Sequence, residues 1–282
     1  MPELPEVETV KKGLEKLLKD FYIKKIDVLK ERSIASLGGS KSFINNIENS
    51  YIGKWERRGK YLIGTLNTQN KNRKGFLVVH LRMTGQFKLI NKQTLPCAHT
   101  RVRFFDKGGK ELRFIDIRNF GQMWYVPSTK LVSETVSGIK RLGPEPFSDE
   151  FNSGYLEKYL KNKKRSIKSA LLDQETVAGI GNIYADETLF DAGINPKTES
   201  RKLKRETLNV LCNSLVKILQ ISIGEGGTTF SDFRDLEGTN GNYGGQAWVY
   251  RRGGERCKKC GEKILREKIC GRSTHWCPSC QK

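Results

Sequence analysis

Four cysteines near the end of the chain restrict its fold more than any other feature of the sequence. They form two pairs, Cys257-x2-Cys260 and Cys277-x2-Cys280, with 16 residues between the pairs. Each pair can bring two thiolates onto one metal ion from a tight turn, and two pairs complete a tetrahedral Zn²⁺ site with no open position. The pattern therefore predicts one structural Zn²⁺ held by a β-hairpin; the alternative is four thiols without a ligand.

The remaining cysteines do not indicate a disulfide framework. The chain has seven cysteines, an odd number, and its first residues, Met1–Glu6, lack the apolar core of a signal peptide. We therefore expect a reducing, cytoplasmic location. Cys270 is interpreted as a bystander of the zinc site, and His275 as a ligand less favoured than the four cysteines.

The charge of the chain points to a polyanionic partner. Lys and Arg number 51 against 31 Asp and Glu, a net charge of +20. Such an excess repels itself in a compact chain unless a polyanion offsets it, and the obvious polyanion is nucleic acid. A membrane surface is the weaker alternative, because no basic helix with an aromatic face is evident and no apolar run reaches the length of about 18 residues that a span needs. We expect no membrane contact.

Part of this charge surrounds the cysteines. Residues 251–282 contain ten Lys and Arg against three Glu. A zinc-held hairpin with this charge is suited to contact phosphate. Arg272, between the cysteine pairs, is the candidate functional residue here; the alternative is one more solvated arginine.

The first part of the chain is predicted to be mainly β-structure. A helix is expected over 5–19, where apolar residues recur at helical spacing, and a second near 41–49. Short strands, separated by Gly-, Asn- or Lys-rich turns, make up the rest. These strands are expected at 23–29, 52–58, 61–66, 76–81, 86–90, 100–105, 111–115 and 122–126. The series favours an antiparallel β-sandwich.

The pattern becomes helical after residue 126. The helices are expected at 155–161, 166–173, 183–192 and 204–222, followed by a glycine-rich loop over 224–245. We therefore divide the chain into an N-terminal domain (1–130), a linker (131–150), a helical domain that includes the loop (151–245) and a zinc finger (246–282).

Two helices of the second half flank a candidate phosphate-binding turn. A basic segment, Lys163–Lys168, begins the first helix, and Gly179 and Gly181 lie in the turn before the second. Asn182 is expected to cap the helix that begins at Ile183, where exposed backbone amides favour phosphate. Together these features favour DNA binding; the alternative is that the glycines only make the turn.

The residue after the initiator methionine has unusual chemical potential. Removal of Met1 leaves a secondary amine on Pro2, and its attack on a sugar C1′ gives a permanently charged iminium ion, which is an electron sink. An α-amino group titrates near neutral pH, and the helix that begins beside it lowers its pKa further. Glu3 is placed to transfer protons, and Lys60 is a further acid, base or phosphate ligand. The alternative is an ordinary proline at position 2.

Several motifs in a fixed order make the chain similar to the bacterial formamidopyrimidine-DNA glycosylases. The resemblance begins with Pro2–Thr9, where Leu4 favours the purine-excising branch over the endonuclease VIII branch, which begins Pro-Glu-Gly-Pro-Glu. The other matching motifs are Gly59–Leu62, His80–Gly85, Asp116–Gly121, Leu142–Pro146, Gly179–Glu187, Gly226–Thr229 and the cysteine pairs.

The resemblance implies an α+β fold: a β-sandwich flanked by helices, then a helix–two-turn–helix domain with a four-cysteine zinc finger, and DNA between two lobes. It also implies that Pro2 is the Schiff-base nucleophile, Glu3 the general acid and base, Lys60 an aid to β-elimination and Arg272 an aid to δ-elimination. The residues matching DNA contacts are His80, Met83, His99, Arg118, Phe120, Lys164 and Asn182.

Three of these roles also make physical sense for an enzyme that extrudes a base from a duplex. Met83 and Phe120 are apolar wedges for the vacated stack, and Arg118 can hydrogen-bond the orphaned partner base. The alternative for Met83 and Phe120 is ordinary core packing. The loop over 224–245 matches a segment that closes over the everted base; the alternative is mere disorder. Arg251 stands where many relatives have glycine, and Asn119 where a basic residue is common.

Three functions follow from these features. The first is a glycosylase with lyase activity on oxidised purines, such as 8-oxoguanine and formamidopyrimidines, or on abasic sites in double-stranded DNA. The second is a glycosylase of the same fold for oxidised pyrimidines. The third is a zinc-ribbon DNA-binding protein without catalysis. A monomer with one Zn²⁺, located in the bacterial cytoplasm with the nucleoid, is expected in the first case.

Overall fold

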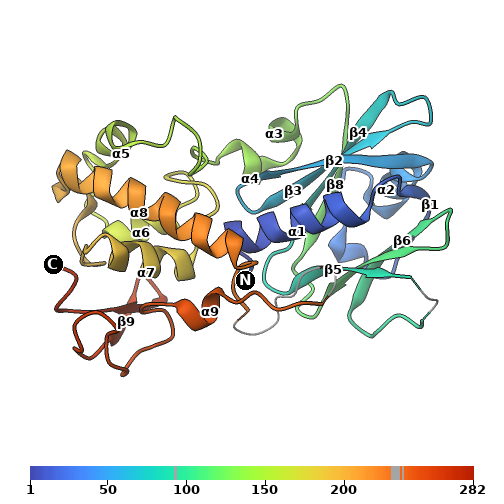
Figure 1. Cartoon of the computed structure of the whole chain (residues 1–282). Coiled ribbons are helices and arrows are strands. Elements are labelled where there is room, and N and C mark those ends of the chain that lie inside the picture. Colours follow the sequence, from blue (N-terminus) through green and yellow to red (C-terminus); the bar gives the residue numbers. More distant parts are fainter. Residues whose placement is uncertain (92–93, 230–235, 237) are drawn as a thin grey trace. The chain divides into compact units, whose positions relative to one another are not determined.

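The chain folds into two units, each with its own core (Figure 1). One unit contains Met1–Lys140 and Gly226–Asn242, and the other contains Arg141–Glu225 and Tyr243–Lys282. The structure is a computed structural model, and it describes residues 1–91, 94–229, 236 and 238–282.

The described strands of the first unit all belong to one sheet, in the order β5-β7-β6-β1-β2-β3-β4-β8. Every pair of neighbours is antiparallel. The strands are β1 (Tyr22–Val28), β2 (Ser50–Arg58), β3 (Tyr61–Asn67), β4 (Arg73–His80), β5 (Gly85–Ile90), β6 (Thr100–Asp106), β7 (Glu111–Asp116) and β8 (Gln122–Pro127). Each lies within a few residues of its predicted range.

The sheet folds over so that its two halves face each other. Trp55 of β2 is fully buried, and its ring centroid lies 6.5 Å from that of Phe87 in β5, although three strands separate β2 from β5 within the sheet. Apolar residues from both halves fill the space between them and form the core of the unit. The predicted antiparallel sandwich is therefore confirmed.

Helices cover this sheet. They are α1 (Leu4–Leu17), α2 (Gly39–Ile47) and the short α3 (Val132–Thr135) and α4 (Ser137–Lys140). Helix α1 forms because Pro5 suits a first turn and because Leu4, Val7, Val10 and Leu14 recur on one face, which is buried against β2 and β3 (Figure 1). The sheet thus holds the N-terminal residues, which precede α1, at a fixed place.

The second unit is helical and ends in a hairpin. Its helices are α5 (Ser153–Leu160), α6 (Ile167–Leu172), α7 (Asn182–Asp191), α8 (Arg205–Gly224) and the short α9 (Tyr243–Gln246). Helix α7 packs against α6, α8 and β10, and α5 packs against α8. Strands β9 (Leu265–Ile269) and β10 (Arg272–Trp276) pair antiparallel, as expected for the finger. The predicted helices are all present.

Helix α8 has 20 residues and a mean hydropathy of 1.2 over its most apolar window, which is sufficient in length and composition to cross a membrane. It is the only described helix that meets this test. A core helix of a soluble protein passes the same test, and Leu208, Leu211, Leu215 and Leu219 of α8 are buried in the unit. Burial of this face explains the apolar composition without a membrane.

Candidate functional site

The first residues of the chain are buried, and Glu6 organises them. Pro2 and Glu3 are both buried, while Met1 is half exposed. The Glu6 carboxylate is also buried; its Oε2 accepts the N–H of Glu3 at 2.8 Å, and its Oε1 accepts the N–H of Thr228 at 2.8 Å. A carboxylate in the first turn of a helix is favoured by the helix dipole. Glu6 therefore joins the predicted catalytic residues to the glycine-rich loop.

The same loop closes on itself close to Glu6. A Cβ atom on Gly227 would lie 2.9 Å from Glu6 Oε1, so glycine is required for this approach. Thr228 bridges to Asn242, and Thr229 Oγ1 accepts the N–H of Gly241 at 2.8 Å. Residues 230–235 and 237 of the predicted loop lie outside the described residues. Glu6 therefore holds the first arm of the loop, at Thr228, and the second arm, at Gly241 and Asn242, pairs with the first.

Lys60 lies in the turn between β2 and β3, and it is buried. Arg57 holds this turn against α1, since its Nε lies 2.9 Å from Glu8 Oε2 and its Nη1 donates to Gly59 O at 3.1 Å. Gly59 has φ 55°, a left-handed conformation that glycine adopts without strain. The turn that carries Lys60 is thus fixed to α1 through Arg57.

His80 ends β4 and is a neutral imidazole. Burial, together with the nearby charges of Arg82 and Lys60, lowers the pKa of His80 to about 3. The neutral ring accepts the backbone N–H of Arg82 on its Nδ1 at 2.9 Å and packs edge-on against Tyr61. His80 therefore shapes the start of the segment that carries Met83.

Two loops of the first unit present apolar side chains to solvent. Met83 is 37% exposed and Phe120 is 40% exposed, so the alternative of core packing for these residues is wrong. Arg118 is also exposed, and its guanidinium lies over the Phe120 ring at 5.2 Å. Asn119 between them has φ 55°, which explains an asparagine here, because asparagine tolerates this conformation better than most residues.

His99 lies beside these loops and is exposed. Its Nδ1 is 3.5 Å from Nη2 of the buried Arg101, and its carbonyl oxygen accepts the N–H of Asp116 at 2.9 Å. His99, Met83, Arg118 and Phe120 therefore come from neighbouring ends of β5, β6 and β7.

In the second unit, Lys164 is exposed, whereas Lys168 at the end of the same basic segment is fully buried. The Lys168 charge of this basic segment is therefore not presented to solvent. Its Nζ lies 2.6 Å from Asp186 Oδ1 and donates to Thr274 Oγ1 at 2.8 Å and to Ser273 O at 3.1 Å. Lysine is rarely buried unless paired, and here the pair joins α6 to α7 and β10.

Asn182 begins α7 but does not cap it. The N-cap is Gly181, without a side-chain hydrogen bond, so the predicted cap is wrong. The physical reason is that Asn182 Nδ2 donates to Ser273 O at 2.8 Å. The side chain thereby supports β10, and the backbone amides at the start of α7 remain the groups suited to phosphate.

Arg272 is the first residue of β10 and is exposed, one residue after Gly271 in the hairpin turn. The next three residues are anchored from below: Lys168 and Asn182 hold Ser273 and Thr274, and Asp186 Oδ2 accepts the N–H of His275 at 2.9 Å. Arg272 therefore projects from a strand whose backbone is fixed by buried polar groups.

The four cysteines of the two pairs gather at the base of this hairpin. All four Sγ atoms lie within 4.8 Å of one another, with Cys257 to Cys280 at 3.9 Å and Cys260 to Cys277 at 3.5 Å. Tetrahedral zinc, with Zn–S bonds of about 2.3 Å, needs S···S separations of about 3.8 Å, so the cluster fits the ion. Cys270 is exposed outside this group, and His275 contacts Asp186 instead.

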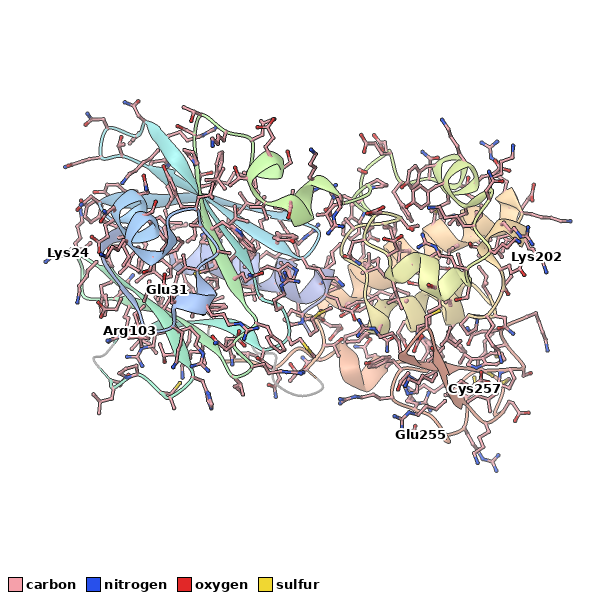
Figure 2. The ribbon with its side chains drawn as sticks, turned by 180° about the vertical axis from the view of Figure 1, so that it is seen from behind. Lys24, Glu31, Arg103, Lys202, Glu255 and Cys257 are labelled. Carbon is pink, nitrogen blue, oxygen red and sulfur yellow. The ribbon has the colours of Figure 1, made fainter. Side chains whose placement is uncertain are left out.

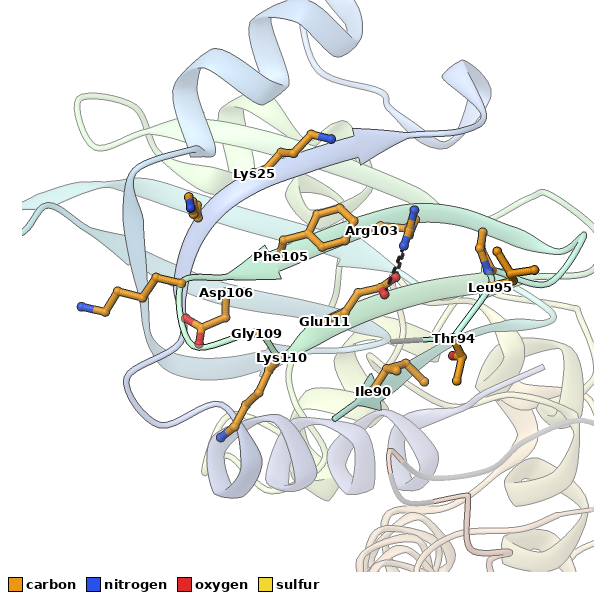
Figure 3. A pocket seen from close by; sticks show the side chains of 13 residues that line it. Lys25, Ile90, Thr94, Leu95, Arg103, Phe105, Asp106, Gly109, Lys110 and Glu111 are labelled. Carbon is orange, nitrogen blue, oxygen red and sulfur yellow. Dashed lines mark hydrogen bonds and ion pairs between the residues drawn. The ribbon is translucent and has the colours of Figure 1, made fainter. Parts of the chain in front are cut away.

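One further hollow, of about 730 Å³, lies beside β6 and β7 in the first unit (Figure 3). Its Arg103 and Glu111 side chains are joined by an ion pair, with Nε 2.7 Å from Oε1. None of the predicted site residues, all of which the structure describes, lines it. Positively charged side chains lie on the surface of both units: Lys24 of the first and Lys202 of the second both project outward (Figure 2).

Three family models match successive parts of the chain. The formamidopyrimidine-DNA glycosylase N-terminal domain matches residues 1–123, the H2TH domain of the same family matches 142–234, and the zinc finger found in FPG and IleRS matches 254–282. The chain belongs to the formamidopyrimidine-DNA glycosylase family. The finger match and the four-cysteine cluster together show one structural Zn²⁺.

Similar proteins cover the whole chain. The formamidopyrimidine-DNA glycosylase of Prochlorococcus marinus strain NATL2A is 81% identical, with all of both chains covered. The Lactococcus lactis FPG mutant G226P, solved with a Fapy-dG containing DNA, has a TM-score of 0.91 and 32% identity over all of both chains. A MutM structure in complex with carbocyclic 8-oxo-G containing DNA has a TM-score of 0.90 and 33% identity, also over all of both chains.

Sequence reasoning missed the buried polar groups that hold these parts of the family fold. Glu6, Asp116, Asp186 and Glu187 are all buried. Glu187 accepts the N–H groups of residues 248–250 and the hydroxyl of Tyr243, while burial raises its pKa. The sequence offered one signal for their burial, since each of these acids lies within an apolar segment or a motif. Their hydrogen-bond partners could not be identified, because most of them are far away in the sequence.

Proposed function

We propose that this chain is a bifunctional DNA glycosylase that excises oxidised purines, such as 8-oxoguanine and formamidopyrimidines, and then cleaves the abasic strand. The observation that carries the proposal is the buried Pro2–Glu3 pair, whose backbone is fixed by Glu6 at the start of α1. Family membership and the DNA lesions in the related complexes support it.

The first step requires a free amine. In the encoded chain the Pro2 nitrogen is in a peptide bond with Met1, so Met1 must be removed. The secondary amine then attacks the sugar C1′ and forms a C–N bond, while the bond from C1′ to the base breaks and its electrons leave with the base. The attacking nitrogen loses its proton, and its lone pair then expels the ring oxygen O4′, so that the C1′–O4′ bond breaks and an iminium ion on Pro2 forms. Glu3 transfers the protons that the departing base and O4′ take up.

Elimination follows from this iminium ion, which accepts electrons at C1′. Loss of a proton from C2′ expels the 3′-phosphate (β-elimination), and a second proton loss expels the 5′-phosphate (δ-elimination), leaving a one-nucleotide gap with phosphate ends. We assign Lys60 to the first elimination and Arg272 to the second. The buried position of Lys60 and the exposed, backbone-anchored position of Arg272 are consistent with these roles.

DNA contacts follow the same reasoning. Met83 and Phe120 fill the place of the everted base, and Arg118 bonds to the orphaned partner base. His99 and Lys164 contact the DNA, and phosphates are contacted by the residues at the end of β4, including His80, and at the start of α7, including Asn182. We propose that the protein acts as a monomer in the bacterial cytoplasm, with the nucleoid, and that the loop over 224–245 closes on the everted base.

The test is trapping of the iminium ion. Purified protein is incubated with a duplex that contains one 8-oxoguanine, borohydride is added, and the adduct is located by peptide mass. We expect the DNA on the N-terminal peptide that begins at Pro2. A matched control protein carries extra residues before Met1, so that Met1 is not removed and the Pro2 nitrogen stays in a peptide bond. This protein should bind DNA without forming an adduct.

Two other outcomes would decide against the proposal. Adducts formed only with oxidised pyrimidines in a parallel set of duplexes would assign the chain to pyrimidine lesions. Binding of every duplex without any adduct, in protein whose Met1 is removed, would leave a DNA-binding protein without catalysis.

A further inference from the structure

The two loops that carry Met83 and Arg118–Phe120 are joined by one buried pair of side chains. Thr84 is 8% exposed and Asp116 is fully buried. The Thr84 hydroxyl donates to Asp116 Oδ1, and it accepts the backbone N–H of Arg118 at 2.9 Å. The hydroxyl, which belongs to the Met83 loop, thus bonds at two points to the segment that carries Arg118 and Phe120, using its single donor and one of its lone pairs.

Asp116 extends these bonds to the other end of the second loop and to His99. Its Oδ2 accepts the N–H of Gly121 at 2.7 Å, so the carboxylate closes the loop Ile117–Phe120 at both ends through Thr84 and Gly121. Its backbone carbonyl accepts Arg101 Nε at 2.7 Å, and its N–H donates to His99 O at 2.9 Å. A single buried residue is therefore bonded to every segment that carries a predicted wedge or neighbouring DNA contact.

Glycines leave room for this pair. A Cβ on Gly85 would lie 2.4 Å from Leu81 O, and a Cβ on Gly121 would lie 2.5 Å from the Phe114 ring and 3.0 Å from Asp116 Oδ2. Only glycine therefore lets the backbone pack this closely at these two positions. The backbone of the two loops is held by hydrogen bonds to the Asp116 carboxylate. Such charge-assisted bonds are stronger than those between neutral groups.

We propose that Thr84 and Asp116 are positioning residues for base eversion: they fix the Met83 loop and the Arg118–Phe120 loop as one rigid wedge. This inference rests on the proposed function, because only an enzyme that everts a base needs side chains to fill the vacated stack. Filling the vacated stack requires both loops to enter the duplex together. If they are uncoupled, the base is everted less often, while the chemistry at Pro2 is unaffected once a sugar is in place.

The test compares two substrates in single-turnover experiments. Thr84→Val keeps the shape of the side chain and removes the hydroxyl. We expect excision of 8-oxoguanine from a duplex to slow between about tenfold and about 100-fold, the range expected for a small misplacement of positioning groups. Borohydride trapping on an abasic site in a single strand, which has no stack to fill, should change less than about twofold, because the positioning term is absent there. Thr84→Ser restores the donor and should recover most of the excision rate.

A matched control replaces another buried threonine. Thr188 is fully buried in the second unit, and its hydroxyl has no hydrogen-bond partner among the described residues, so Thr188→Val should leave both rates unchanged. If Thr84→Val does not fold, Thr84→Ala leaves space for a water molecule and is measured in its place. In a Met83→Ala, Phe120→Ala background the same replacement should have little further effect, because the wedge is already absent.

The outcomes separate this proposal from the proposed function. If wild-type protein forms no Pro2 adduct on either substrate, the proposed function fails. If wild-type protein is active and Thr84→Val slows both substrates equally, or slows neither, the positioning role is wrong. A spectroscopic readout gives the same distinction: 2-aminopurine opposite the lesion should brighten on binding wild-type protein and Thr84→Ser but not Thr84→Val.

Discussion

Each unit has an exposed arginine with a proposed role, Arg118 or Arg272, on backbone that a buried aspartate supports, but the two aspartates have different partners. In the first unit, Asp116 lies under the loop of Arg118 and accepts a hydroxyl and a backbone N–H. In the second unit, Asp186 lies under the strand of Arg272 and is paired with the fully buried Lys168. Polar donors can be replaced by water or by a related side chain, whereas a buried ammonium needs its counter-ion.

This difference predicts how each region fails. The hairpin of Arg272 depends on a metal and an ion pair, both of which are lost in an all-or-none manner. The wedge loops depend on several hydrogen bonds, each of modest strength, which can be weakened one at a time. The finger should therefore respond sharply to perturbation, and the wedge gradually.

Removal of zinc should have the largest effect. Binding of structural zinc contributes on the order of 10 kcal/mol to folding in finger peptides, so chelation should unfold the hairpin β9–β10. Hydrogen exchange measured with and without a chelator should show loss of protection across the hairpin, while the sheet of the first unit keeps its protection. Equal loss in both units would contradict the separate support inferred for each.

Replacement of Asp186 should have the next largest effect. Asp186→Ala leaves the Lys168 ammonium buried without a counter-ion, which costs about 3–5 kcal/mol in the free energy of unfolding. Urea unfolding measures this change. The double variant Lys168→Met, Asp186→Leu removes both charges and should recover most of the loss; no recovery would show that the charges themselves are not the cause.

Replacement of Asp116 should cost less. Asp116→Asn can keep its oxygen on the Gly121 N–H and turn its N–H toward Thr84 Oγ1, which has a free lone pair. Both contacts then lose the charge of the carboxylate, at about 2–3 kcal/mol for the two together. Urea unfolding of this variant alongside Asp186→Ala tests the comparison directly. If Asp116→Asn is the more damaging of the two, the ranking of the two regions is reversed.

The parts of the fold that depend on local pattern were predictable. The strands of the sheet and the long helices were located within a few residues because their periodicity is a property of adjacent residues. The four cysteines were predictable because their spacing encodes the metal geometry. The burial of Lys168 could not be predicted, since nothing near it in the sequence reveals Asp186 or Thr274, the latter 106 residues away.

The same limit applies to the backbone of the functional loops. The left-handed backbone conformations of Asn119 and Arg251 were not predicted. For Arg251 a signal was available, because the resemblance places glycine at this position in many relatives. The wedge residues were predicted through motifs and stay a prediction, while their support by Thr84 and Asp116 depends on a contact between residues 32 apart. Long-range polar contacts of this kind follow from the fold and not from local pattern.

The contribution of His80 to the effect of acidification should be the smallest, and it belongs to the unit that carries the wedge loops. Burial beside Arg82 and Lys60 lowers the pKa of His80 to about 3, whereas an unfolded histidine titrates near about 6.5. Between these values the unfolded chain binds a proton that the native chain does not, so stability decreases as the pH falls and is fully present above about pH 7. From about pH 7 to about pH 5 the loss should be about 2 kcal/mol.

Urea unfolding of wild type and His80→Gln at both pH values isolates this contribution, because the other groups titrate in both proteins. The glutamine oxygen can still accept the Arg82 N–H, so the variant should lose about 2 kcal/mol less than wild type over this interval; an equal loss would mean that His80 is protonated in the native protein and that the Met83 segment does not rest on a neutral ring.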